Sequence, residues 1–202
     1  RLLNALLEVG VVLALVAANA FFVAAEFALV SVRRSRVEEL VRGGSRAARA
    51  VQRVLQNQEK FISTTQVGIT IASLLLGYFG EHFLFEIISP YVALVPGLSA
   101  NDPGGAVLGH SVAFTGALLM VTYMHVVFGE IAPKNYAIAR AERTALRFAL
   151  PIEIIYYLLW PLIVVLNRSA LLFLRVIRAP ATGLRGAVHS QEEIEMLIRE
   201  SH

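Results

Sequence analysis

The stretch VGVVLALVAANAFFVAAEFALVSVRRSR, residues 9–36, carries the pattern that decides the fold. Residues 9–32 are almost all apolar, and a helix needs about 20 such residues to cross a bilayer. The run is longer than the apolar part of a signal peptide, and its basic residues follow it rather than precede it. We therefore predict a permanent membrane span over residues 9–32.

The composition supports an all-α integral membrane protein. Hydrophobic residues make up 56% of the chain and the mean hydropathy is +0.64, which is more apolar than a typical soluble domain. The absence of cysteine excludes disulfides, thiolate metal sites and a cysteine nucleophile. The basic segments flank apolar runs and lack interleaved aromatics, so we expect no nucleic-acid partner.

Two further apolar runs predict spans over residues 61–80 and 111–128. The segment between them contains no Lys or Arg, whereas arginines crowd residues 33–58 and 140–147. Because basic loops stay on the cytoplasmic side, the first segment is external and the other two are cytoplasmic. We predict a multi-pass protein of the cell membrane with its N-terminus outside and its C-terminus in the cytoplasm.

Residues 33–58 show a helical amphipathic pattern that Gly43 and Gly44 interrupt. This pattern predicts two short juxtamembrane helices near the lipid surface. A solvated basic loop that merely obeys the charge rule fits the same residues equally well.

The apolar run within residues 148–178 is long enough to span, but basic residues flank both of its ends. It also contains Pro151 and Pro161, and its central aromatics are typical of an interface. We interpret it as a kinked juxtamembrane helix that lies on the cytoplasmic face or dips into it. A fourth span is the alternative. Residues 179–202 are interpreted as a linker and the start of an acidic helix that leads to a further cytoplasmic region.

Polar residues within the expected spans are functional candidates, because unpaired polar groups are costly in hydrocarbon. Asn19 and Glu26 share one face of the first span. The third carries Thr115 and Thr122, again seven residues apart, then His125 and finally Gly129-Glu130. The second span carries a stripe of polar residues: Ser63, Gln66, Thr70 and Ser73, with Thr64 and Thr65 beside it. We predict that the three stripes meet. An oxygen-rich set of this kind suits a hard cation such as Mg²⁺ or Na⁺.

The stretch FGEIAPKN, residues 128–135, ends the third apolar run. Pro133 has no N–H, so the carbonyl of Gly129 loses its helical hydrogen bond. Free carbonyls of broken helices bind cations in secondary transporters. The predicted cation ligands are Glu130, Asn19, Gln66, Gly129, Thr65, Ser73 and Glu26.

Each candidate has a structural alternative. Hydroxyls in membrane helices commonly bond to their own backbone or join helices. Glu26 can instead pair with Arg33 or Arg34, Glu130 can be a simple helix-end charge, and His125 fits an interfacial residue better than a ligand. Three glycines of the second span fit close helix packing better than a pore lining: Gly68, Gly77 and Gly80.

Three motifs together resemble the transmembrane domain of the CorC/CNNM family: NAFFVAAEFALVSVRRSRVEEL, STTQVGITIASLLLGYFGE and FGEIAPKNYAIARAE. The resemblance runs from about residue 5 to residue 190. It implies a link to magnesium, three spans per protomer, a cytoplasmic juxtamembrane belt and a homodimer. It also implies that a pair of nucleotide-binding CBS domains follows the membrane domain.

The resemblance makes Glu130 the principal acidic ligand, and Glu26 matches a carboxylate common in bacterial members. Asn19 and Val23 stand where many members have serines. Thr65-Gln66-Val67 stands where many members have Gly-Asn-Asn. These departures concern which ion this chain binds and which atoms coordinate it.

Two functions remain open from the sequence. The first is a Mg²⁺ transporter that exports Mg²⁺ in exchange for Na⁺. The second is a membrane anchor or sensor that regulates another magnesium transporter. We expect no enzymatic activity, because the chain shows no nucleophile–base set, no phosphate-binding glycine loop and no zinc motif.

Overall fold

The computed structural model describes residues 2–98 and 103–177, and these residues are helical with no strand. Their elements are α1 (Leu2–Ser31), α2 (Arg34–Arg42), α3 (Arg46–Gln56), α4 (Gln58–Val92), α5 (Pro103–Met124), η1 (His125–Ile131), α6 (Ala132–Ala139) and α7 (Ala141–Val176). The chain divides into two compact units, residues 1–159 and 160–202, with the boundary inside α7. The predicted linker and acidic helix, residues 179–202, lie outside the described residues.

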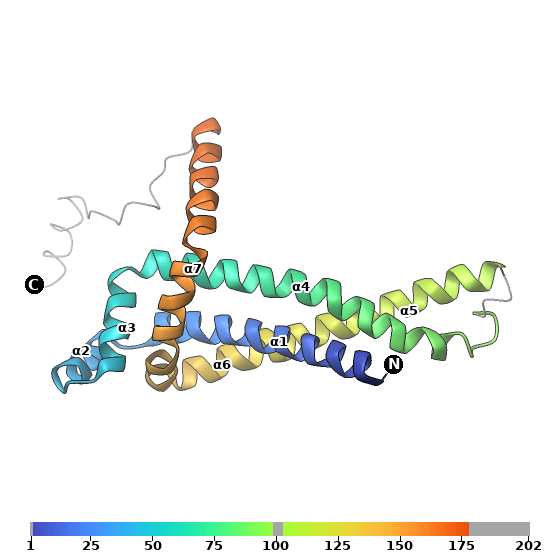
Figure 1. The fold of residues 1–202 in the computed structure, drawn as a ribbon, viewed down its shortest axis with the longest axis horizontal. Coiled ribbons are helices and arrows are strands. Elements are labelled where there is room, and N and C mark those ends of the chain that lie inside the picture. The colour runs from blue at the N-terminus through green and yellow to red at the C-terminus, as the bar shows by residue number, and fades with distance from the viewer. Residues whose placement is uncertain (1, 99–102, 178–202) are drawn as a thin grey trace, which may run out of the picture. The chain divides into compact units, whose positions relative to one another are not determined.

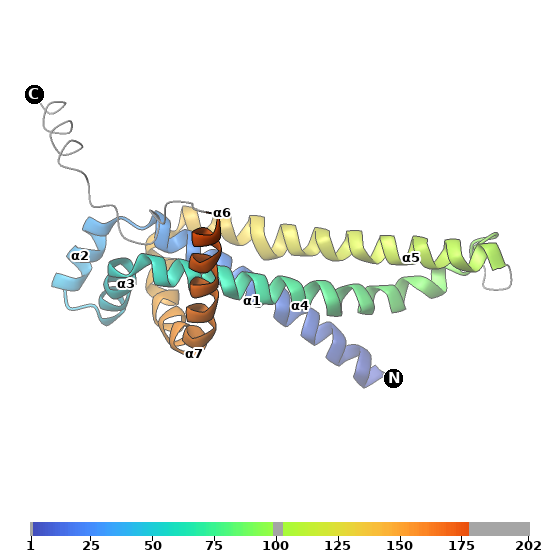
Figure 2. The same cartoon turned by 90° about the horizontal axis from the view of Figure 1, so that it is seen from above.

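Three long helical rods lie side by side in the first unit (Figures 1 and 2). α4 packs along both α1 and α5, and α1 also contacts η1 and α6. Small side chains occupy many of the buried positions, including Ala25 and Ala28 on α1 and Ala113 and Ala117 on α5. Because lipid tails are themselves apolar, helices in a membrane associate through close packing of this kind.

Two of the three glycines predicted to allow close packing do so. A methyl group on Gly68 would lie 2.4 Å from the ring of Phe22, and one on Gly80 would lie 3.0 Å from Val121. Gly77 has no neighbour within 4 Å of the same position, so it does not serve packing within the chain.

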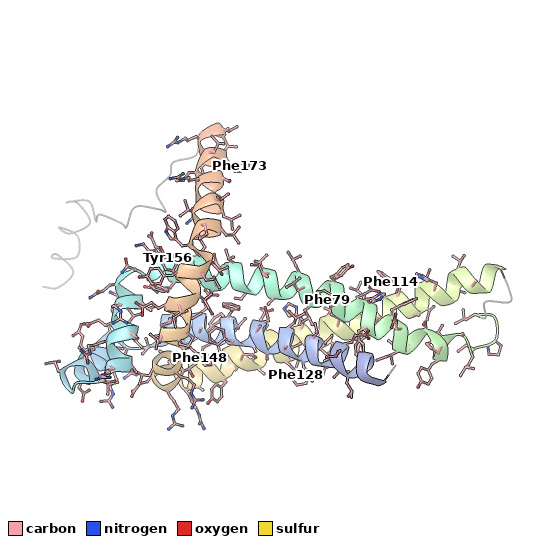
Figure 3. All side chains as sticks on the ribbon, viewed as in Figure 1. Phe79, Phe114, Phe128, Phe148, Tyr156 and Phe173 are labelled. Atoms are coloured by element: carbon pink, nitrogen blue, oxygen red, sulfur yellow. The ribbon has the colours of Figure 1, made fainter. Side chains whose placement is uncertain are left out.

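Large apolar side chains cover the outside of the long helices, among them Phe79, Phe114 and Phe128 (Figure 3). Within the described residues, four helical segments are long and apolar enough to cross a membrane: Leu6–Ser31, Gln58–Val92, Gly104–Ala139 and Ala141–Val176. A multi-pass membrane protein is therefore confirmed. The number of spans is not, because α7 qualifies by length and composition, and three spans stays a prediction.

Residues 33–58 contain two short helices, α2 and α3, separated at Gly44, whose φ of 85° suits glycine. The Ser45 hydroxyl accepts a hydrogen bond from the backbone N–H of Ala48 and caps α3. Arg53 of α3 forms a two-pronged ion pair with Glu153 of α7, at 2.9 and 2.8 Å. We call α2, α3 and the first turns of α7 the basic end of the bundle.

Candidate functional site

α5, η1 and α6 follow one another as one continuous helical rod, which does not break near Pro133 but changes its helical type. η1 is a π-helix over His125–Ile131, and α6 continues it with Pro133 in its first turn. Proline cannot donate a backbone hydrogen bond, so Gly129 lacks the usual donor four residues later. Single π-helical turns of this kind often mark functional sites.

Asn19 of α1 supplies the missing donor. Its Nδ2 donates to the carbonyl oxygen of Gly129 at 3.0 Å, and the Asn19 side chain is only 1% exposed. Glycine suits position 129, because a methyl group there would lie 3.0 Å from Asn19 Nδ2 and 3.1 Å from His125 Cδ2, which would then have to shift. The sequence thus predicted the freed carbonyl, and the structure identifies its partner.

Ser73 of α4 extends the contact to a third helix. Its hydroxyl donates to Asn19 Oδ1 at 3.2 Å and lies 3.1 Å from His125 Nε2. A hydroxyl has one proton, so when Ser73 donates to Asn19, the His125 Nε2–H donates to Ser73. We call Asn19, Ser73, His125 and Gly129 the polar cluster.

The polar cluster contains only neutral donors and acceptors when His125 is neutral, and it joins α1, α4 and η1. Every buried polar side-chain atom among the described residues has a hydrogen-bond partner. The cluster therefore avoids the cost of an unpaired buried polar group, about 1–3 kcal/mol each. Its oxygen atoms are the chemical type that Mg²⁺ prefers, but in this structure they bond to one another.

The two predicted carboxylate ligands lie apart from the polar cluster. Glu130 adjoins Gly129 but its side chain is exposed on the chain's surface, and no hydrogen bond or ion pair within the described part of the chain involves it. Glu26 is half-buried and lines a small pocket with Thr65 and Phe61. No ion pair among the described residues joins Glu26 to Arg33 or Arg34, so the structure does not support that alternative.

Within the described part of the chain, the remaining predicted polar side chains form no hydrogen bond with the polar cluster. Gln66 is exposed, and Thr65 donates to its own helix at the Ile62 carbonyl. Thr115 and Thr122 lie on the exposed side of α5. The prediction that all three stripes meet is therefore wrong for Thr115 and Thr122, because alanines fill the buried face of α5 instead. It holds for His125 and Gly129 at the end of the third span, which contact Ser73 and Asn19.

His125 is the member of the polar cluster that sequence reasoning undervalued. It lies four residues before Gly129, about one helical turn, so the two share a face. Its spacing was a usable signal, but its contact with Ser73 depends on how α4 aligns with η1. No group of three or more His, Cys, Asp or Glu side chains that could hold a metal occurs among the described residues.

Several apolar helices crossing a bilayer around a polar cluster define a polytopic helical membrane domain. The chain belongs to the CNNM family, described as the cyclin M transmembrane N-terminal domain, which it matches over residues 10–202.

Similar proteins occur in Bacillus subtilis. UPF0053 protein YhdT is 38% identical over 199 residues, which cover 98% of this chain and 41% of YhdT. UPF0053 protein YhdP is 36% identical, with 93% of this chain and 41% of YhdP covered. UPF0053 protein YugS is 32% identical, with 98% and 44% covered. The chain thus spans about two fifths of the length of these curated relatives.

Proposed function

We propose that this chain is the membrane domain of a transporter that exports Mg²⁺ in exchange for Na⁺. Membership of the CNNM family is consistent with a magnesium-related role in the membrane. The observation that carries the proposal is the polar cluster at the π-helix, where Asn19, Ser73 and Gly129 bring three uncharged oxygen atoms together. Glu130 is the next residue after Gly129, although its side chain is exposed.

The structure suggests what ion entry must change. Asn19 Oδ1 is occupied by Ser73, and the Gly129 carbonyl is occupied by Asn19. An entering Mg²⁺ exchanges these hydrogen bonds for ligation, while Glu130 supplies negative charge. Mg²⁺ sheds water reluctantly and usually keeps several waters, so few protein ligands suffice.

The proposal extends to the assembly. Glu130 and the threonines of α5 are exposed on a single chain, and a homodimer would cover such groups from lipid. In this proposal, CBS domains that bind a nucleotide follow the membrane domain. The N-terminus lies outside and the C-terminus lies in the cytoplasm, because the basic end carries the clustered arginines.

The test uses the full-length protein in proteoliposomes with an imposed Na⁺ gradient, and it measures Mg²⁺ flux with an internal Mg²⁺ indicator. We expect gradient-dependent flux that Glu130→Gln abolishes, while the variant keeps its thermal stability and oligomeric state. The matched control is Glu38→Gln, which removes an exposed carboxylate from α2 and should leave the flux intact. Equal flux from Glu130→Gln and wild type would refute a role for Glu130 on the ion path.

The polar cluster also favours a second function, a non-transporting anchor or sensor. Each of its buried side-chain polar atoms has a hydrogen-bond partner within the protein, as expected of polar groups that hold membrane helices together. In this case the folded, oriented protein gives no Mg²⁺ flux with or without the Na⁺ gradient. Glu130→Gln then has no effect on the transporter that the protein regulates.

A further inference from the structure

A second polar site lies at the basic end, away from the polar cluster. An open pocket of about 960 Å³ lies between the junction of α1 with α2 and the junction of α6 with α7. Four arginines line it: Arg33, Arg36, Arg140 and Arg143. Neither proposed function uses this pocket.

The pocket lies at the depth where two candidate spans end. The spans Leu6–Ser31 and Gly104–Ala139 finish at residues that line it. Ile138 belongs to its lining and is exposed, as is Val30 one residue before Ser31. An arginine-lined pocket with an exposed apolar edge therefore lies at the ends of two candidate spans.

Among the described residues, only one of the four arginines that line the pocket forms ion pairs with the pocket's carboxylates. Arg36 holds both lining carboxylates, Glu39 at 2.7 Å and Glu142 at 3.1 Å. The ion pairs of the described residues include none made by the other three lining arginines, Arg33, Arg140 and Arg143. These three guanidinium groups leave the pocket with an excess of positive charge.

Two local features position or strengthen the positive charge of the pocket. Arg140 lies over the ring of Tyr136, with its guanidinium carbon 5.6 Å from the ring centre. α2 begins beside the pocket, and no side chain caps its first turn. The free N–H groups of a helix start carry a partial positive charge, which adds to the field of the arginines.

We propose that this pocket binds a phosphate-bearing anion, with the headgroup of an anionic phospholipid as its source. Guanidinium groups pair with phosphate oxygens in a two-pronged geometry, and basic pockets on the cytoplasmic side of membrane proteins bind anionic headgroups. The exposed apolar edge accommodates the start of the acyl chains. The proposal does not depend on whether the protein transports magnesium.

The test is a lipid titration of the full-length protein in detergent, followed by native mass spectrometry. The probes are phosphatidylglycerol, which carries a net negative charge, and phosphatidylcholine, which carries a phosphate but no net charge. We expect saturable binding of phosphatidylglycerol, weakened about tenfold by Arg140→Gln with Arg143→Gln, since each surface arginine contributes appreciably to attraction of anionic lipid.

The control variant is Arg46→Gln with Arg49→Gln, which removes the same charge at the same spacing from α3, outside the pocket. It should bind phosphatidylglycerol as wild type does. Equal loss in both double variants, or no loss in either, would overturn the proposal, because binding would then follow general surface charge. If the first double variant does not fold, Arg33→Gln alone serves the same comparison.

A second arm separates the two sources of phosphate. Inorganic phosphate at millimolar concentration is added to the lipid-bound protein. Retention of the lipid supports the headgroup as the ligand. Displacement that depends on Arg140 and Arg143 supports a soluble phosphate compound in the same pocket. Displacement of lipid equally from wild type and from the pocket variant would refute a phosphate site.

Discussion

The interior of the bundle and its basic end hold polar groups by opposite means. In the interior, Asn19, Ser73 and the Gly129 carbonyl form hydrogen bonds that need no formal charge. At the basic end, Arg36 and Arg53 form ion pairs with exposed or partly exposed carboxylates. The difference follows from the surroundings, because an unpaired charge is far more costly in hydrocarbon than in water.

The two regions also differ in what disturbs their contacts. The interior contacts require close helix approach, so a single methyl group disturbs them. The ion pairs join long side chains near water, where solvent and salt weaken their attraction. Three substitutions can break or sharpen this comparison, taken from the largest expected effect to the smallest.

The largest effect is expected for Gly68→Ala. The added methyl group would lie 2.4 Å from the Phe22 ring, so α1 and α4 must move apart or the ring must turn. Overpacking of this kind costs about 1–3 kcal/mol in free energy of unfolding. Thermal denaturation of the full-length protein in detergent measures it. Gly77→Ala is the control, since its methyl group meets nothing within 4 Å. Helix propensity alone favours alanine over glycine, so a similar loss in Gly77→Ala would contradict the packing explanation.

Asn19→Leu comes next, because leucine has a similar size but cannot donate to Gly129. The stranded carbonyl and the altered Ser73 contact should cost about 1–3 kcal/mol, at the lower end if other groups compensate in the membrane. The measurement is again the midpoint of thermal denaturation. Thr70→Val is the control, because the Thr70 hydroxyl is exposed and donates to its own helix at Gln66. A stable Asn19→Leu protein would show that the polar cluster serves something other than packing.

The smallest effect is expected for Arg53→Gln. The Arg53 guanidinium is about half exposed, although Glu153 is mostly covered. The Glu153 hydrogen bond raises the pKa of Arg53 above its ordinary value, so this side chain keeps its charge throughout the usual pH range. We expect a slight drop in the denaturation midpoint that disappears at 1 M salt, where the Debye length is about 3 Å. A large, salt-independent loss would instead place this ion pair among the interior contacts.

Much of the interior was predictable from the chain, as the Gly129 carbonyl shows. Pro133 removes a donor at a known distance along the helix, and this is a local rule that needs no tertiary information. The choice of Asn19 as the new donor depends on how α1 slides and turns against η1. That alignment belongs to the tertiary packing of α1 against η1, which periodicity alone does not reveal.

The prediction of which helix face is buried failed for a similar reason. A seven-residue spacing shows that Thr115 and Thr122 share a face of α5, but not which face is buried. Ala113 and Ala117 allow closer approach of α4, and the packing of membrane helices favours small residues over hydroxyls. The π-helical turn then adds a local change of winding before Glu130, which a constant helical period does not anticipate.

The length of α4 has a consequence for what the protein presents beyond the bilayer. From Gln58 to Glu81 the helix rises about 35 Å, which already exceeds the roughly 30 Å thickness of the hydrocarbon layer. The remaining turns to Val92 add about 17 Å on the side away from the basic end. They carry His82 and Glu86, whose Nε2 and Oε1 atoms lie 3.5 Å apart and whose side chains are exposed, as suits a segment in water. A hydrocarbon layer that begins at Gln58 therefore leaves the last turns of α4 above the lipid surface as a short rigid stalk.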